Sequence, residues 1–148
     1  MKVRILLVDD EENFVGMLAE RLRNRDFDVT TALSGEEALG KIKEYNFDVA
    51  IIDVLMPGLG GIETLRGMKK VKPLIEVIML TGHATVETGI EGMKLGAYDY
   101  LLKPCEIDVL LEKIKKAQAR KAEQEERIRK ALAERLRTSP MSVLKDES

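Results

Sequence analysis

The chain has 148 residues, of which 45% are hydrophobic and 34% charged, a composition typical of one soluble globular domain with some additional length. The formal net charge is −2, and residues 1–111 carry 13 basic and 19 acidic side chains, which disfavours nucleic acid as the main partner. No apolar run approaches the roughly 20 residues that span a bilayer, and the single cysteine, Cys105, excludes an internal disulfide, so we expect a cytoplasmic protein that does not enter membranes.

Strand and helix patterns alternate along the first half of the chain. Glu11 and Glu12 lie in the first turn of the first helix, where the helix dipole favours negative charge. Ser34 and Glu37 have the spacing of a capping box, which marks the start of the second helix. The patterns predict a strand over 5–8, a helix over 10–25, a strand over 28–33, a helix over 34–45 and a strand over 48–53.

The alternation continues in the second half. The glycine- and proline-containing segment 56–61 predicts a loop, and Pro73 prevents the next helix from continuing. Gly96 is a typical residue after a helix C-terminus. The patterns predict a helix over 62–71, a strand over 75–80, a helix over 85–95, a strand over 97–102 and a long helix from 106 to about 140.

Consecutive β-branched and apolar residues in the strand runs are typical of strands that are covered on both faces. With right-handed crossovers, this pattern predicts an α/β fold with a doubly wound, five-stranded parallel sheet. We expect the flavodoxin-like strand order 2-1-3-4-5, with five flanking helices and an extended C-terminal helix.

Chemically active residues follow four of the five predicted strands. Asp9 and Asp10 follow the first strand, Asp53 the third, Thr81 the fourth and Lys103 the fifth. The carboxyl ends of parallel strands share one edge of a sheet, so these side chains are expected to converge there. A carboxylate can accept a phosphoryl group. The three carboxylates would repel one another unless a cation is bound, and Mg²⁺ is suitable because it prefers oxygen ligands. Each residue taken singly is equally consistent with a helix cap or turn former.

The strand-end motifs, with their order and separations, resemble the receiver domains of two-component response regulators. The resemblance covers about residues 2–117. It implies a signalling switch in which a sensor histidine kinase phosphorylates Asp53, and no enzyme activity beyond the domain's own phosphorylation and dephosphorylation. The matching segments are Leu7-Val8-Asp9-Asp10-Glu11, Asp53-Val54-Leu55-Met56-Pro57-Gly58, Thr81-Gly82-His83 and Lys103-Pro104.

The resemblance also implies a role for each site residue. Asp10, Asp53 and the backbone carbonyl of Leu55 would bind Mg²⁺ directly, and Asp9 would support the ion partly through water. No other cofactor is implied.

The resemblance further implies a switch and a bond geometry. Thr81 and Lys103 would hold the phosphoryl oxygens, and Tyr100 would turn inward when the Thr81 hydroxyl moves toward the phosphate. The surface of the fourth helix, fifth strand and fifth helix would then change. The Lys103-Pro104 bond would be cis. The alternative for Tyr100 is ordinary strand packing with an exposed hydroxyl.

The chain is expected to divide into a receiver domain over 1–117, a helical extension over 118–138 and a flexible tail over 139–148. An apolar stripe fades between Gln118 and Arg127 and returns at Ile128, Ala131, Leu132 and Leu136. A solvated helix, a short coiled coil between two chains and, least favoured, a nucleic-acid contact are the three interpretations of this segment.

Three functions compete. The first is a phosphorylation-activated switch that binds an unknown downstream target or a second copy of itself. The second is a phosphorylation-independent interaction module with the same fold. The third, a phosphatase or a flavin carrier, is disfavoured because Leu55 stands where a phosphatase would place a second acid, and because Glu11 and Glu12 would repel a flavin phosphate.

Overall fold

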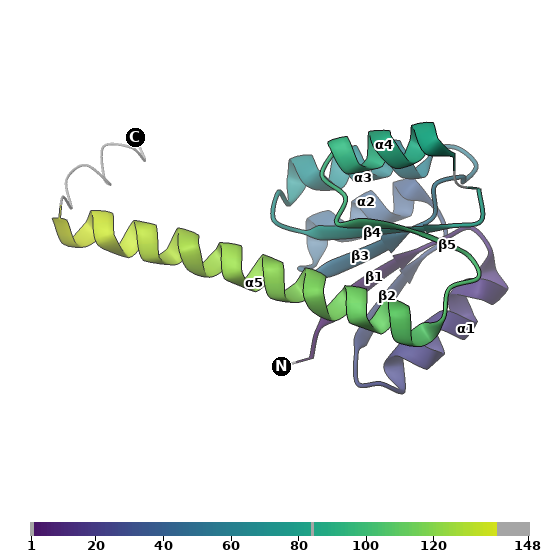
Figure 1. The fold of residues 1–148 in the computed structure, drawn as a ribbon, viewed down its shortest axis with the longest axis horizontal. Helices are drawn as coiled ribbons and strands as arrows, with labels where there is room; N and C mark the ends of the chain where they lie inside the picture. Colours follow the sequence, from purple (N-terminus) through teal and green to yellow (C-terminus); the bar gives the residue numbers. More distant parts are fainter. Residues whose placement is uncertain (1, 84, 139–148) are drawn as a thin grey trace.

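Five parallel strands form the centre of the protein, with helices on both faces (Figure 1). The computed structural model describes residues 2–83 and 85–138, so the expected tail over 139–148 lies outside the described residues. The strand order is β2-β1-β3-β4-β5, which confirms the predicted doubly wound topology. Among the described residues, no helix is both long and apolar enough to cross a membrane.

Every predicted helix and strand is present, and its ends differ from the predicted ends by no more than two residues. In chain order the elements are β1 (Arg4–Val8), α1 (Glu12–Arg23), β2 (Asp28–Ala32), α2 (Gly35–Glu44), β3 (Val49–Ile52), α3 (Gly61–Val71), β4 (Glu76–Thr81), α4 (Val86–Lys94), β5 (Asp99–Leu102) and α5 (Ile107–Thr138).

Burial follows the position of each strand in the sheet. β3 and β4 are buried along their whole length, and β1 is buried except at its first residue. The outer strands β2 and β5 are only partly covered, because each has a neighbour on one side alone. The expectation of strands covered on both faces therefore holds for the three central strands.

The buried hydrophobic residues form two clusters, one on each face of the sheet. Helices α1 and α5 cover one face, where Leu22 and Ile114 are fully buried. Helices α2 and α3 cover the other face through residues such as Ile42 and Leu65, and α4 lies beside α3 (Figure 1).

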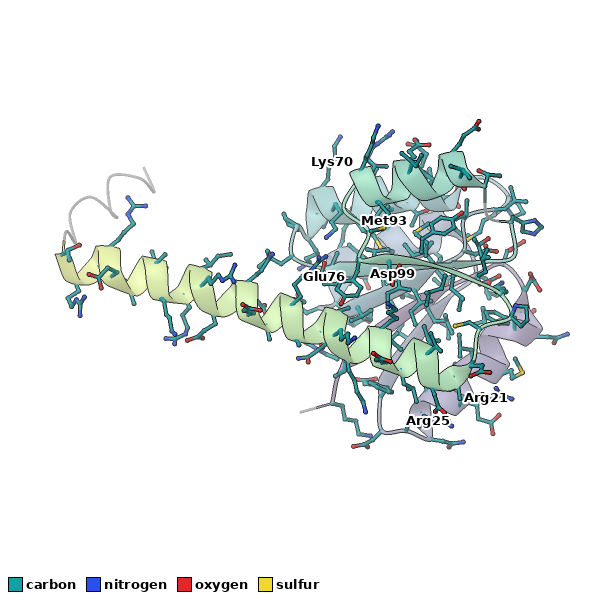
Figure 2. The ribbon with its side chains drawn as sticks, viewed as in Figure 1. Arg21, Arg25, Lys70, Glu76, Met93 and Asp99 are labelled. Carbon is teal, nitrogen blue, oxygen red and sulfur yellow. The ribbon has the colours of Figure 1, made fainter. Side chains whose placement is uncertain are left out.

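Helix α5 is fixed to the domain by a buried acid. Glu76, at the start of β4, is only 4% exposed and accepts hydrogen bonds from Nε and Nη2 of Arg120. Lys69 Nζ lies 3.6 Å from the same carboxylate. The Arg120 guanidinium also stacks over the Tyr98 ring, 4.6 Å from its centroid. Figure 2 shows Glu76 at the edge of the domain from which α5 projects.

A second acid, Asp48, pairs with the next residue of α5, Lys121. Asp48 Oδ2 accepts a 2.8 Å hydrogen bond from the backbone N–H of Arg4, and Lys121 Nζ lies 3.4 Å from Oδ1. Burial alone would raise the pKa of Asp48, but the hydrogen bonds from Arg4 and the charge of Lys121 outweigh burial and lower that pKa. Most of α5 beyond these contacts is exposed, including its apolar residues Ile128, Leu132 and Leu136.

Replacing Glu76 by Gln should lower the free energy of unfolding by about 1–3 kcal/mol, because Arg120 and Lys69 would lose their charged partner at a buried position. Urea unfolding monitored by circular dichroism measures this change. Glu63→Gln is the control, since Glu63 pairs with Arg66 at an exposed site and should cost less than about 0.5 kcal/mol. Equal losses in the two variants would contradict the prediction.

The stability difference between wild type and Asp48→Asn should depend on pH. The folded-state pKa of Asp48 lies below its ordinary value of 3.8. The ionised carboxylate therefore stabilises the fold above that value, and this contribution is lost as pH falls through the folded pKa. Urea titrations between about pH 6 and about pH 3 should show wild type more stable by about 1 kcal/mol at the upper end and a shrinking difference below it. A difference independent of pH would refute the assignment.

Candidate functional site

The parallel register brings the predicted strand ends together at one edge of the sheet. Val8 of β1 is paired with Ile52 of β3, and the N–H of Asp53 donates a 3.0 Å hydrogen bond to the carbonyl of Val8. Asp9 and Asp53 therefore follow directly opposite positions. On the other side, the N–H of Lys103 donates a 2.9 Å hydrogen bond to the Thr81 carbonyl, so these two residues are also neighbours.

Three carboxylates meet at this edge. Asp9 and Asp53 are 1% and 2% exposed, whereas Asp10 is exposed. One carboxylate oxygen from each lies within 4.8 Å of the other two. Asp53 Oδ1 is buried and has no hydrogen-bond partner among the described residues. A buried carboxylate oxygen without a partner is costly, so this atom is suited to an electrophile or a cation.

Lys103 supplies positive charge to the site. Its Nζ lies 2.6 Å from Asp9 Oδ2, 3.6 Å from Glu11 Oε1 and 3.9 Å from Asp53 Oδ2. Burial alone would lower the pKa of Lys103, but the hydrogen bond to Asp9 and the surrounding carboxylates outweigh burial and raise that pKa. Lys103 is therefore charged at neutral pH. The Lys103-Pro104 bond is cis, as expected.

Asp9 is held by two donors. Its Oδ1 accepts a 2.9 Å hydrogen bond from the N–H of Glu11, and its Oδ2 accepts from Lys103. Burial raises the pKa of Asp9, and the nearby Asp53 charge adds to this, so that the two donors only partly offset the shift. Burial is the main cause of the raised pKa of Asp9, and the Asp53 charge is a smaller cause that also raises the pKa of Lys103.

The two predicted switch residues, Thr81 and Tyr100, form hydrogen bonds with different partners. Thr81 is fully buried, and its Oγ1 accepts a 3.0 Å hydrogen bond from the N–H of His83. Tyr100 is partly buried, and its hydroxyl lies 2.7 Å from Thr88 Oγ1 on α4. Thr88 and Thr85 form a reciprocal capping box at the start of this helix. The Tyr100 hydroxyl therefore links β5 to α4 by a hydrogen bond.

A pocket of about 390 Å³ opens beside the carboxylates. Leu55 lies at its wall with 59% of its surface exposed. The pocket is lined by Asp10, Glu11, Asp53, Leu55, Met56, Pro57 and His83.

Two contacts of Lys103 were not foreseen from the sequence. The sequence placed Glu11 in the first turn of a helix without a contact to Lys103, and it did not single out Phe14. The Phe14 ring lies under the Lys103 ammonium, 4.0 Å from Nζ to the ring centroid. The two residues are separated by about ninety positions in the chain, so no local pattern could indicate this contact.

Known proteins share this fold and arrangement. Residues 5–115 match the response regulator receiver domain family. The transcriptional regulatory protein ZraR from Salmonella typhimurium is 40% identical over 118 residues, which cover 80% of this chain and 27% of ZraR. A CheY-like receiver domain from Methanospirillum hungatei superimposes with a TM-score of 0.81 at 31% identity and covers 84% of this chain and 99% of its own. The BeF3-activated receiver domain of DrrB superimposes with a TM-score of 0.72 at 34% identity and covers 79% and 97%.

A doubly wound sheet with an acidic triad and a lysine at the carboxyl edge of its strands defines a receiver-type signalling domain. The chain belongs to the response regulator receiver domain family of two-component systems, which is not a classical enzyme family. It spans about a quarter of the length of ZraR. The triad of Asp9, Asp10 and Asp53 is of the type that holds Mg²⁺ in receivers, and its oxygen-only donors suit this ion.

When no divalent cation is present, repulsion among the three carboxylates should lower the free energy of unfolding. Asp53→Asn removes a buried charge that Asp9 and Asp10 repel, so the free energy of unfolding should rise by about 1 kcal/mol in buffer containing EDTA. Asp28→Asn, at an exposed position at the start of β2, is the matched control and should change it by less than about 0.5 kcal/mol. A clear loss of stability in Asp53→Asn would show that relief of repulsion does not dominate.

Proposed function

We propose that the protein is a phosphorylation-activated switch of a two-component system, with Asp53 as the phosphoacceptor. The observation that carries this proposal is the buried Asp53 carboxylate, whose Oδ1 lacks a partner while Lys103 lies 3.9 Å from Oδ2. A carboxylate so placed is a nucleophile beside a cation that can neutralise the incoming charge. Family membership supports the same reading.

The proposed reaction is the transfer of a phosphoryl group from a phosphohistidine of a sensor kinase. An Asp53 oxygen forms the new bond to phosphorus, the phosphorus–nitrogen bond breaks, and the imidazole leaves with its electron pair and takes up a proton. Lys103 exchanges part of its contact with Asp9 for the phosphoryl oxygens, and the Thr81 hydroxyl donates a hydrogen bond to one of them.

Asp10, Asp53 and the Leu55 carbonyl would hold Mg²⁺, with Asp9 in support. When bound, the ion offsets the negative charge of the carboxylates and the phosphoryl group. The fit is supported by the 4.8 Å spacing of the three carboxylate oxygens and by the unpartnered Asp53 Oδ1.

The switch would act through Thr81 and Tyr100. Movement of the Thr81 hydroxyl toward the phosphoryl group would break the hydrogen bond that it accepts from the N–H of His83, and the space that it leaves would admit the Tyr100 ring. Tyr100 would then lose its 2.7 Å contact with Thr88, which links β5 to α4. The α4–β5–α5 surface, where Val86, Ile90 and Leu102 are exposed, would change as a result.

The remaining assignments belong to the same proposal. Residues 1–117 would act as the receiver and 118–138 as a helical extension, in the cytoplasm. The partners would be a sensor histidine kinase and an unidentified downstream protein, with homodimer formation on phosphorylation and no role in binding nucleic acid. A phosphorylation-independent interaction module is the competing function. The full set of Asp10, Asp53, Thr81 and Lys103 disfavours it, because a module without the chemistry has no need of them.

Incubation with acetyl phosphate and Mg²⁺ should add one phosphoryl group to the wild type, measured by intact-mass spectrometry. Asp53→Asn and wild type in EDTA should gain none, because they lack the nucleophile and the metal respectively. Lys103→Met should remain largely unmodified at the same time point, since it lacks the cation that aligns the phosphoryl oxygens.

Hydrodynamic size is measured in the same samples by analytical ultracentrifugation. A gain of mass at Asp53 without any change in size would keep the switch and reject dimer formation on phosphorylation. An unmodified wild type would reject the switch in favour of the interaction module.

A further inference from the structure

The side chain of Lys103 lies between two different environments. Its Nζ faces the carboxylates of Asp9, Glu11 and Asp53. The same atom lies 4.0 Å from the centroid of the Phe14 ring, which belongs to α1. A small apolar cavity between α1 and α5 continues behind this contact and includes Phe14, Met17 and Cys105 in its lining.

An aromatic ring and a carboxylate attract a lysine for different reasons. The ring face is negative because of its quadrupole, and it attracts a cation without offering a hydrogen bond. A carboxylate such as Glu11 attracts the same cation but also repels an incoming phosphoryl group. Phe14 can therefore hold the ammonium at the site without adding negative charge there.

The lysine needs such support because its stem is long and flexible. Ordering a lysine side chain costs conformational entropy, and Lys103 is only partly buried. Phe14 is itself partly buried and packs against the hydrophobic cluster under α1 and α5, which restricts the motion of its ring. The Lys103 stem and ammonium are thereby held near Asp53 before any phosphoryl donor arrives.

We propose that Phe14 is a positioning residue for Lys103, whose ring face, rather than its bulk alone, accelerates phosphoryl acceptance by Asp53. This inference rests on the proposed function, because it concerns the same lysine and the same reaction.

The test compares initial rates of phosphorylation by acetyl phosphate in Mg²⁺ for wild type, Phe14→Leu, Phe14→Tyr and Met17→Leu. Phe14→Leu keeps apolar bulk but removes the ring, and the rate should fall about two- to fivefold, as expected for a partly exposed cation–π contact. Phe14→Tyr keeps the ring and should remain within the error of wild type. Met17→Leu changes the same cavity from the same helix and should also match wild type.

A second measurement does not depend on reactivity, and its first part needs only the wild type. The ε-methylene protons of Lys103 lie near the ring face, so the ring current should shift their NMR signals upfield of those of the exposed lysines in the wild type. The shift should disappear in Phe14→Leu and persist in Phe14→Tyr. Thermal unfolding of each variant verifies that rates are compared between folded proteins.

The outcomes separate the two proposals. A wild type that reacts, with Phe14→Leu equally fast or Phe14→Tyr as slow as Phe14→Leu, overturns the role of the ring and leaves the proposed function intact. Unshifted Lys103 signals in the wild type overturn it as well. A wild type that accepts no phosphoryl group overturns both proposals together.

Discussion

The parallel hydrogen-bonded register of the central strands is the constraint on which the site depends. Because Val8 pairs with Ile52, the next residues of these two strands, Asp9 and Asp53, lie side by side. Because Thr81 pairs with Leu102, Lys103 lies beside Thr81. A slip of one residue would reverse the face of every side chain in a strand, and it would also bury charges in the core. The apolar residues that cover both faces therefore determine the register and, with it, the position of each reactive group.

Two buried acids in this domain illustrate the difference between structural and functional charge. Glu76 is paired with Arg120 and Lys69, so both of its oxygens have partners. Asp53 is equally buried but has one oxygen without a partner and shares a single lysine with Asp9. A fold selected only for stability would not keep the second arrangement, since burial of unpaired charge is costly. The imbalance is what makes the site receptive to a cation and a phosphoryl group.

The fold could be predicted from the sequence because the patterns that mark its helices and strands are local. Apolar runs, the Ser34 cap and Gly96 mark elements that depend on near neighbours, and alternation of strand and helix constrains the topology. The convergence of Asp9, Asp53 and Lys103 was predictable as well, since strand ends must share an edge. Three side-chain contacts could not be predicted, because pairing across distant segments depends on rotamers and on helix orientation. These contacts join Lys103 to Phe14, Tyr100 to Thr88 and Arg120 to Glu76.

The chemistry lies at one end of the strands, and α5 leaves the domain at the opposite end. Past Lys121, whose Nζ pairs with Asp48, the helix continues for 17 residues to Thr138. At 1.5 Å per residue this is a lever arm of about 25 Å, and a rotation of about 10° at its base displaces its tip by about 4 Å. The ion pairs at the base of α5 determine how much of a rotation of the sheet is passed on to the helix. The length of the helix then determines how far its far end moves.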